Sequence, residues 1–354
     1  MDNIQEFKNA KYGLMIHFGL YSLLGGMYKG EKGPAYAEWI ECNKKIPNSE
    51  MDKLAKIFNP IYFDSDYICR FARECGMKYI VITTKHHEGF ALFKSQTDSF
   101  NSYDASPCKR DLIKELADSC KKYDLKLGFY YSQCIDWREP DGGGYTVDAK
   151  YSAGDSWDNN WDFPDRKNKD YSKLFSKKIV PQVKEIMSNY GDVFLAWFDM
   201  PLDSTKEKSE ELYKLVKRLQ PNCLINSRLG NGKFDYVSLG DNEIPDSIPQ
   251  NISEDINENE IYGFKKSPYG LYESACTLNN SWGYNSIDDE WKNAETIFEN
   301  RIKLEKIGIN YLINVGLDWL GRIPYKAEEI LKKVQKLYEE RTIEYNKWEN
   351  ITRR

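Results

Sequence analysis

The sequence predicts an α/β fold, a (β/α)8-type TIM-like barrel, and two observations carry this prediction. Short apolar runs recur along the chain and are followed by amphipathic stretches, which is the pattern of parallel strands joined by crossover helices. The chain has 354 residues, and barrels of this type take about 250 residues or more. We therefore expect a single barrel domain over 1–354, irregular in places, with 325–354 as a closing helix.

The predicted strands are apolar runs bounded by polar or turn-forming residues. Amphipathic stretches between these runs predict the helices, and the last helix is rich in Lys and Glu. The predicted strands lie at 12–18, 78–84, 126–132, 193–199, 223–227 and 310–315, and the helices at about 111–123, 171–189, 204–219, 288–307 and 325–348.

Two long segments, 136–170 and 230–267, are polar and rich in Gly, Asp, Asn and Pro. Loops of this length inside a compact domain usually serve a function. Both segments follow the carboxyl end of a predicted strand, where barrel enzymes carry their reactive groups. We expect them to border a site.

The composition excludes several classes of protein. With 41% hydrophobic and 30% charged residues the chain is typical of a soluble globular protein, so no membrane partner is expected. The net charge of -5 comes without a basic stripe, which argues against a nucleic-acid partner. The 25 Tyr and 9 Trp favour a binder of sugar rings, although a compositional bias would look the same.

The cysteines and the N-terminus bear on the cellular location. The 8 Cys are spread singly without a CxxC pair, so neither a zinc cage nor a dense disulfide framework is predicted. The first residues are polar and lack the apolar stretch of a secretory signal. A cytoplasmic location is the expectation from the sequence as it stands, or secretion if a leader has been removed.

The chain has only 3 His, and all of them lie at or just beyond the ends of predicted strands. His17 ends one run, and His86 and His87 end another. Together with Glu88 they could bind zinc or iron. Adjacent side chains on a strand point to opposite faces, however, so the His pair chelates one ion poorly. Binding the hydroxyl groups of one polar ligand is the reading that we favour.

Asp199 is the strongest candidate for a reactive group. It ends an apolar strand, where a carboxylate is costly unless it is paired or functional. A helix N-cap is the alternative role, but Ser204 is the better cap for the helix that follows. Trp197, two residues earlier, should project to the same side of the strand.

A second carboxylate is needed if Asp199 attacks a sugar. Arg228, at the end of the next predicted strand, could hold a carboxylate or a sugar hydroxyl. Retaining glycosidases place a proton-donating carboxyl about 5 Å from the nucleophile. Asp241, Glu243 and Glu273 follow in suitable segments and are the candidates.

Six motifs occur in one order along the chain: His-Phe-Gly, Ala-Glu-Trp, Lys-His-His-Glu-Gly-Phe, Tyr-Tyr-Ser, Trp-Phe-Asp and Ser-Trp-Gly-Tyr. From about residue 12 to 324 the sequence resembles the α-L-fucosidases of glycoside hydrolase family 29. The resemblance implies a retaining enzyme that removes terminal α-linked L-fucose from glycans or glycoconjugates through a covalent fucosyl-enzyme. It also implies that no metal or organic cofactor takes part.

The resemblance assigns roles to individual residues. Asp199 of Trp-Phe-Asp is the implied nucleophile. For the acid/base Glu273 is preferred over Glu243, and Asp241 ranks third, because the family varies at this position. Many members continue into a C-terminal β-sandwich, which we do not expect here. The implied fucose-binding residues are His17, Glu38, Trp39, His86, His87, Tyr131, Trp197, Arg228 and Trp282.

Two alternatives remain at the level of the sequence. A metal-dependent barrel hydrolase that uses His17, His86 and His87 would lose activity with chelators. A catalytically inactive sugar-binding barrel would keep the aromatic residues and histidines but would need neither Asp199 nor a partner carboxylate. The linkage, the aglycone and the oligomeric state are left open.

Overall fold

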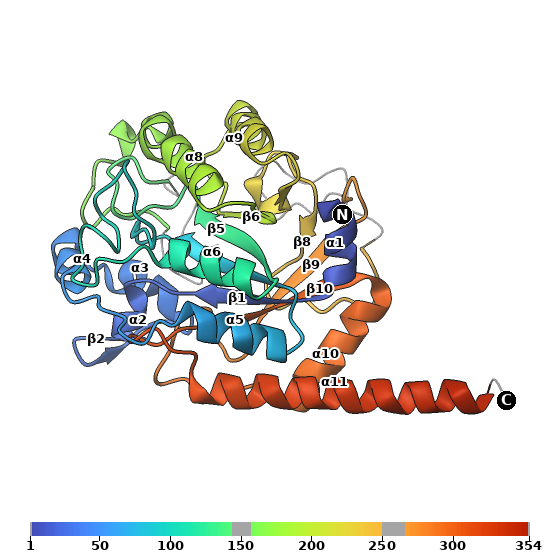
Figure 1. Cartoon of the computed structure of the whole chain (residues 1–354). Helices are drawn as coiled ribbons and strands as arrows, with labels where there is room; N and C mark the ends of the chain where they lie inside the picture. The colour runs from blue at the N-terminus through green and yellow to red at the C-terminus, as the bar shows by residue number, and fades with distance from the viewer. Residues whose placement is uncertain (1, 144–156, 250–265, 353–354) are drawn as a thin grey trace.

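The computed structural model describes residues 2–143, 157–249 and 266–352, with the side chains of 342–352 left out. Its centre is a sheet of eight parallel strands, which curls into a barrel with helices on the outside (Figure 1). The order of the strands is β7-β6-β5-β4-β1-β10-β9-β8. The strands are β1 Tyr12–His17, β4 Tyr79–Lys85, β5 Lys126–Ser132, β6 Leu195–Asp199, β7 Leu224–Ile225, β8 Val237–Ser238, β9 Tyr272–Thr277 and β10 Ile309–Gly316.

The predicted barrel class is confirmed, and the six predicted strands are all present. The sequence did not predict β8 or β9. The segment 230–267, predicted as a loop, contains β8, while 250–265 lies outside the described residues. In the other predicted loop, 144–156 lies outside them as well.

The barrel closes between β7 and β8 through a narrow, irregular seam. A single parallel bridge joins Asn226 to Tyr236 there. The backbone N–H of Asp235 donates to the carbonyl of Ile225 at 2.8 Å, and the N–H of Ile225 donates back to the Asp235 carboxylate at 2.9 Å. Side-chain bonding therefore replaces part of the ladder between these strands, which have two residues each.

Strand residues alternate between two apolar regions, because successive side chains point to opposite faces. One set, including Val81, Tyr130 and Leu312, packs inside the barrel. The other, including Phe129 and Tyr131, packs against the helices. Both faces are buried, so apolar residues occur on both faces of the strands.

The five predicted helices are present with shifted ends, and the helix predicted from 288 begins at Ala294, whereas the helix at 65–74 was not predicted. The helix predicted at 204–219 begins after Thr205, whose hydroxyl accepts a hydrogen bond from the N–H of Lys208, so the prediction of Ser204 as the cap is wrong. The segment 171–189 is one continuous helical stretch with a π-helical middle. The major helices are α5 Ser65–Glu74, α6 Leu112–Lys122, α7 Tyr171–Leu174, η4 Phe175–Ile179, α8 Val180–Asn189, α9 Lys206–Leu219, α10 Ala294–Ile307 and α11 Tyr325–Thr352.

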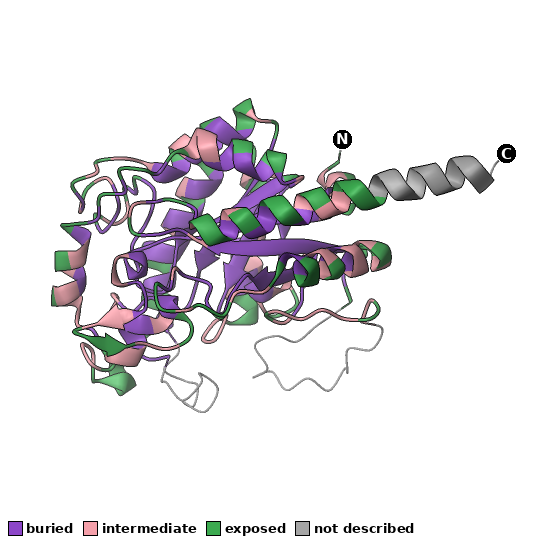
Figure 2. Ribbon diagram, turned by 90° about the horizontal axis from the view of Figure 1, so that it is seen from below, coloured by how far each residue is buried: buried purple, intermediate pink, exposed green. Residues whose placement is uncertain are grey.

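Helix α11 lies along the outside of the barrel next to α10 (Figure 1). It buries Ala327, Leu331 and Val334, which share one face at helical spacing, and its opposite side is exposed (Figure 2). In the described ranges no helix is long and apolar enough to cross a membrane. The smaller elements are α1 Asn3–Ala10, α2 Tyr21–Leu24, β2 Met27–Tyr28, β3 Glu31–Lys32, η1 Ala37–Trp39, α3 Ile40–Lys44, α4 Asn48–Ala55, η3 Arg166–Asn168 and η5 Ser227–Leu229.

Candidate active site

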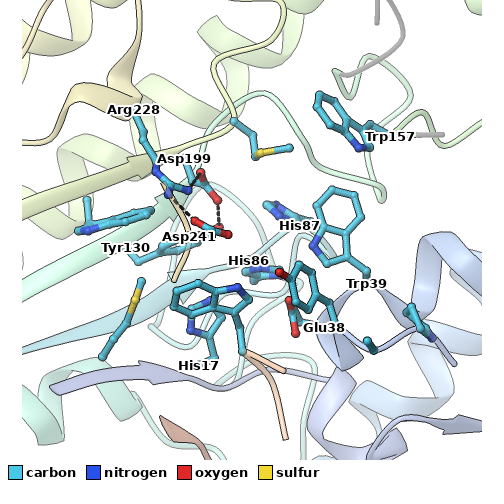
Figure 3. Close-up of a pocket in the computed structure, with 17 residues that line it drawn as sticks. His17, Glu38, Trp39, His86, His87, Tyr130, Trp157, Asp199, Arg228 and Asp241 are labelled. Carbon is cyan, nitrogen blue, oxygen red and sulfur yellow. Dashed lines mark hydrogen bonds and ion pairs between the residues drawn. The ribbon is translucent and has the colours of Figure 1, made fainter. Parts of the chain in front are cut away.

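A cavity of about 470 Å³ opens at the carboxyl ends of the strands, a size that suits a small-molecule site. Six Tyr or Trp and three His side chains form about half of its lining, and Asp199, Arg228 and Asp241 lie together on one side (Figure 3). The cavity is lined by Met15, His17, Pro34, Ala35, Tyr36, Glu38, Trp39, His86, His87, Tyr130, Trp157, Trp197, Asp199, Met200, Arg228, Asp241 and Trp282.

Asp199 is the last residue of β6 and projects into this cavity. Met200 has a left-handed φ of 57° and Pro201 follows, so the strand ends at the carboxylate. The hydroxyl of Tyr130 donates to Oδ2 of Asp199 at 2.8 Å, and Nη1 of Arg228 lies 3.4 Å from Oδ1. Burial raises the pKa of Asp199, while Arg228 opposes the shift by favouring the ionised form.

Arg228 connects Asp199 to a second carboxylate, that of Asp241. Asp241 lies in the loop after β8 and accepts a hydrogen bond from Nη2 of Arg228 (Figure 3). The guanidinium also lies over the ring of Trp197, 4.8 Å from its centre. A planar cation with several donors can hold two carboxylates at once. One buried Arg thus brings both acidic groups to the same side of the cavity.

Glu243 and Glu273, the acids preferred from the sequence, do not line the cavity. Glu243 turns back on its own loop, where Oε2 accepts the N–H of Gly240 at 2.9 Å. Glu273 belongs to β9 and lies fully buried inside the barrel. It accepts hydrogen bonds from the hydroxyl of Tyr79 at 2.7 Å and from Nε1 of Trp197 at 2.9 Å, and burial raises its pKa to about 7. Of the three candidate acids, Asp241 is the one that lines the cavity, although the sequence placed it third.

His17 and His87 are each fixed by a chain of hydrogen bonds behind the cavity. The Nδ1 of His17 lies 2.7 Å from the amide oxygen of Asn314, whose Nδ2 donates to the carbonyl of Trp282. The Nδ1 of His87 lies 2.7 Å from the hydroxyl of Ser132, which donates to the carbonyl of Ile135. The amide oxygen of Asn314 can only accept, and the hydroxyl of Ser132 already donates its proton to Ile135. Both rings therefore carry their proton on Nδ1.

These histidines are uncharged in the folded protein. Burial lowers the pKa of His17 and of His86 to about 3, and it lowers that of His87 well below the usual value. His17 and His87 therefore present Nε2 as a hydrogen-bond acceptor. In the described ranges no three His, Cys, Asp or Glu side chains have the arrangement of a metal site.

Glu38 and Trp39 come from the short helix η1 and form the opposite wall. Oε2 of Glu38 accepts the N–H of Gly283 at 2.8 Å, and burial raises its pKa to about 7. The ring of Trp39 packs edge-on to His87 with centroids 4.9 Å apart. Trp282 lies beside His17 at 5.4 Å, so the expected aromatic enclosure is present.

Tyr131 is the one predicted sugar-binding residue that points away from the cavity. It lies on the outer face of β5, and its hydroxyl donates to Gln182 of α8 at 2.8 Å. The inward position belongs to Tyr130, because neighbours on a strand face opposite sides. The prediction of Tyr131 is wrong by one residue. Tyr36, Trp157 and Met200 were also not predicted, because they lie in loops without a periodic pattern.

The family comparison agrees with this geometry. A model of the family described as Alpha-L-fucosidase matches residues 2–340. The chain belongs to the alpha-L-fucosidase family. The resemblance to glycoside hydrolase family 29 is confirmed, and with it, at the level of the family, the predicted retaining glycoside hydrolase.

Relatives of known name place the chain in the same family. A putative alpha-L-fucosidase of Caenorhabditis elegans is 26% identical over 350 residues, and the match covers 93% of this chain and 63% of that protein. The structure of the alpha-L-fucosidase AlfC from Lactobacillus casei in complex with alpha-L-fucose is 52% identical with a TM-score of 0.89, covering 97% of this chain and 99% of that one. A Vibrio alpha-L-fucosidase is 30% identical with a TM-score of 0.83, covering 95% and 55%.

Proposed function

We propose that this chain hydrolyses terminal α-linked L-fucose with retention of configuration, with Asp199 as the nucleophile and Asp241 as the acid/base. The observation that carries the proposal is the pair of carboxylates joined by Arg228 in one cavity. Retaining glycosidases require two carboxyl groups close to the bond that breaks. Glu243 and Glu273 are unsuited to proton transfer because neither reaches the cavity.

In the first step Asp199 attacks the anomeric carbon of fucose. The bond to the leaving oxygen breaks, and Asp241 donates its proton to that oxygen. A fucosyl-enzyme ester of inverted configuration results. The hydrogen bond from Tyr130 and the charge of Arg228 keep Asp199 ionised, as a nucleophile must be.

In the second step the Asp241 carboxylate accepts a proton from water, and the water oxygen attacks the same carbon. The ester bond to Asp199 breaks, so fucose leaves with its original configuration. The pair His17 and His87 and the carboxyl of Glu38 would bond the sugar hydroxyls, while Trp39 and Trp282 would cover its apolar surfaces.

The proposed substrates are fucosylated oligosaccharides or glycoconjugates. A variant of AlfC in complex with Fuca(1,6)GlcNAc is 52% identical to this chain, with 97% of this chain and 99% of that one covered. Fucose linked 1,6 to N-acetylglucosamine is therefore the first natural linkage to test. The whole chain acts as one catalytic unit in this proposal.

Hydrolysis of an aryl α-L-fucoside followed by NMR tests the proposal. The α-anomer of fucose should appear first and the β-anomer only by mutarotation, since two inversions restore the configuration. Initial release of the β-anomer, or no release of fucose, would reject the proposed double displacement.

A further inference from the structure

His17, His86 and His87 form part of the cavity wall, called here the histidine wall. Two interacting buried glutamates, one of them next to His86, have no part in the proposed reaction. Glu88 and Glu41 are each only 2% exposed. Neither side chain lines the cavity. Among the described residues neither oxygen of Glu41 has a hydrogen-bond partner. Buried carboxyl groups without compensation are costly, so their presence calls for a physical role.

Glu88 is held in one orientation against His86. Its Oε1 accepts the N–H of Leu20 at 3.3 Å. Gly19 has no side chain at this point, where a Cβ would lie 2.1 Å from that oxygen. The other oxygen, Oε2, is 3.5 Å from Nδ1 of His86. In the described part of the chain neither of these two atoms has a hydrogen-bond partner, so each is available to the other.

Burial favours the protonated form of Glu88, and the charges around it act in both directions. It is faced by Tyr21 from α2, Glu41 from α3, Lys85 from β4 and Asp136 from the loop after β5. The one cation in this set, Lys85, is bound to Asp136 at 3.0 Å and is already compensated. Burial raises the pKa of Glu88 to about 8. Near neutral pH the carboxyl group therefore carries a proton.

We propose that Glu88 is a positioning residue whose carboxyl O–H donates from Oε2 to Nδ1 of His86 and holds that ring as the Nε2–H tautomer. The proton is on Oε2 because Oε1 is occupied as an acceptor. His86 then offers Nε2–H to the cavity as a donor. His17 and His87 have the opposite tautomer and offer acceptors.

This inference rests on the proposed function for the identity of the ligand. A sugar hydroxyl both donates and accepts, so a wall with one imidazole donor and two imidazole acceptors orients the ring more closely than three equal groups would. When the pH rises through about 8, Glu88 ionises and becomes an acceptor. The proton of His86 then moves to Nδ1, and the donor to the sugar is lost.

The chain is well suited to a direct test because it has only 3 His. Protein labelled with ¹⁵N in histidine would be examined by long-range ¹H–¹⁵N NMR, with a His86→Gln sample to assign that ring. Near neutral pH we expect two rings protonated on Nδ1 and one, His86, on Nε2. Three rings protonated on Nδ1 would overturn the proposal. The measurement needs no substrate, so its outcome is independent of the proposed reaction.

Substitutions separate this role from simple packing. Glu88→Gln places an amide N–H₂ where the carboxyl O–H stands, so His86 should stay protonated on Nε2 and the change near pH 8 should disappear. Glu88→Leu removes the donor, and KM for an aryl fucoside should rise about tenfold with a smaller effect on kcat. Protonation of His86 on Nδ1 in Glu88→Gln would contradict the proposal.

Glu41→Gln is the matched control, because it alters a neighbouring acid of equal burial. In this variant His86 should keep its proton on Nε2, and the change near pH 8 should persist. An equal effect of Glu41→Gln and Glu88→Leu on the tautomer would show that packing, and not the hydrogen bond from Glu88, sets it.

Discussion

The hydroxyl of Tyr130 donates a 2.8 Å hydrogen bond to the carboxylate of Asp199. The two residues come from adjacent parallel strands, in which Tyr130 pairs with Trp197 and Ser132 with Asp199. The ring of Tyr130 stacks on that of Trp197 at 5.5 Å, so the hydroxyl has a fixed position. The pairing of β5 with β6 thus places the hydroxyl that favours the ionised form of Asp199.

Tyr130→Phe should therefore move the acidic limb of the pH profile of kcat/KM to higher pH. The hydroxyl bonds the ionised form of Asp199 and lowers its pKa, so its removal raises that pKa further above the usual value. Asp199 then ionises only at a higher pH, so activity at acidic pH should fall. The measurement is the pH dependence of aryl fucoside hydrolysis.

The neighbouring tyrosine gives a matched control for this effect. Tyr131→Phe removes the hydrogen bond to Gln182 and should cost about 1 kcal/mol in the free energy of unfolding. Its pH profile should match that of the wild type, because the hydroxyl lies outside the cavity. A profile shifted by Tyr131→Phe and unaffected by Tyr130→Phe would refute the assignment of the two positions.

Replacement of the acid/base should depend on the leaving group. Asp241→Ala should lower kcat/KM about 100-fold or more for a natural disaccharide, because its leaving group needs a proton. The loss should be smaller for the first step with an activated aryl fucoside, whose leaving group departs without one. Glu243→Ala should not discriminate between the two substrates, since this side chain bonds its own loop. Discrimination by Glu243→Ala and none by Asp241→Ala would reverse the assignment.

Glu273 should stabilise the folded protein because it accepts hydrogen bonds from two buried donors. Glu273→Ala leaves the N–H of Trp197 and the hydroxyl of Tyr79 without their acceptor and should cost roughly 3 kcal/mol in unfolding free energy. Glu273→Gln keeps an acceptor for Trp197 and should cost about 1 kcal/mol. Chemical denaturation measures both values, and equal losses would argue against this hydrogen-bond arrangement.

The proposed nucleophile could be predicted from the sequence, whereas its proposed partner could not. Asp199 is conspicuous because a carboxylate ends an apolar strand. The position of Asp241 depends on β8, which has two residues and no periodic pattern, and on the pairing with Arg228. Glu273 was misleading for the opposite reason: it lies on a regular strand that carries it into the barrel.

The choice between Tyr130 and Tyr131 shows a similar limit. Both faces of a barrel strand are buried, so the strand sequence shows no alternation of polar and apolar residues. The sequence pattern therefore does not indicate which side chains face the barrel interior. Packing reveals it, since Tyr130 belongs to the interior set and Tyr131 to the set beneath the helices. The barrel could be predicted because apolar runs alternate with amphipathic stretches, and the three histidines could be singled out because they lie at or just beyond the ends of predicted strands.

The central claim, that Asp199 is the nucleophile, is tested most directly by Asp199→Gly with an aryl α-L-fucoside and external azide. Without azide, hydrolysis should be almost abolished. With azide, the anion should occupy the space left by the carboxylate and yield fucosyl azide of inverted configuration, identified by NMR. Full activity in the variant, or fucosyl azide with retained configuration, would contradict the assignment.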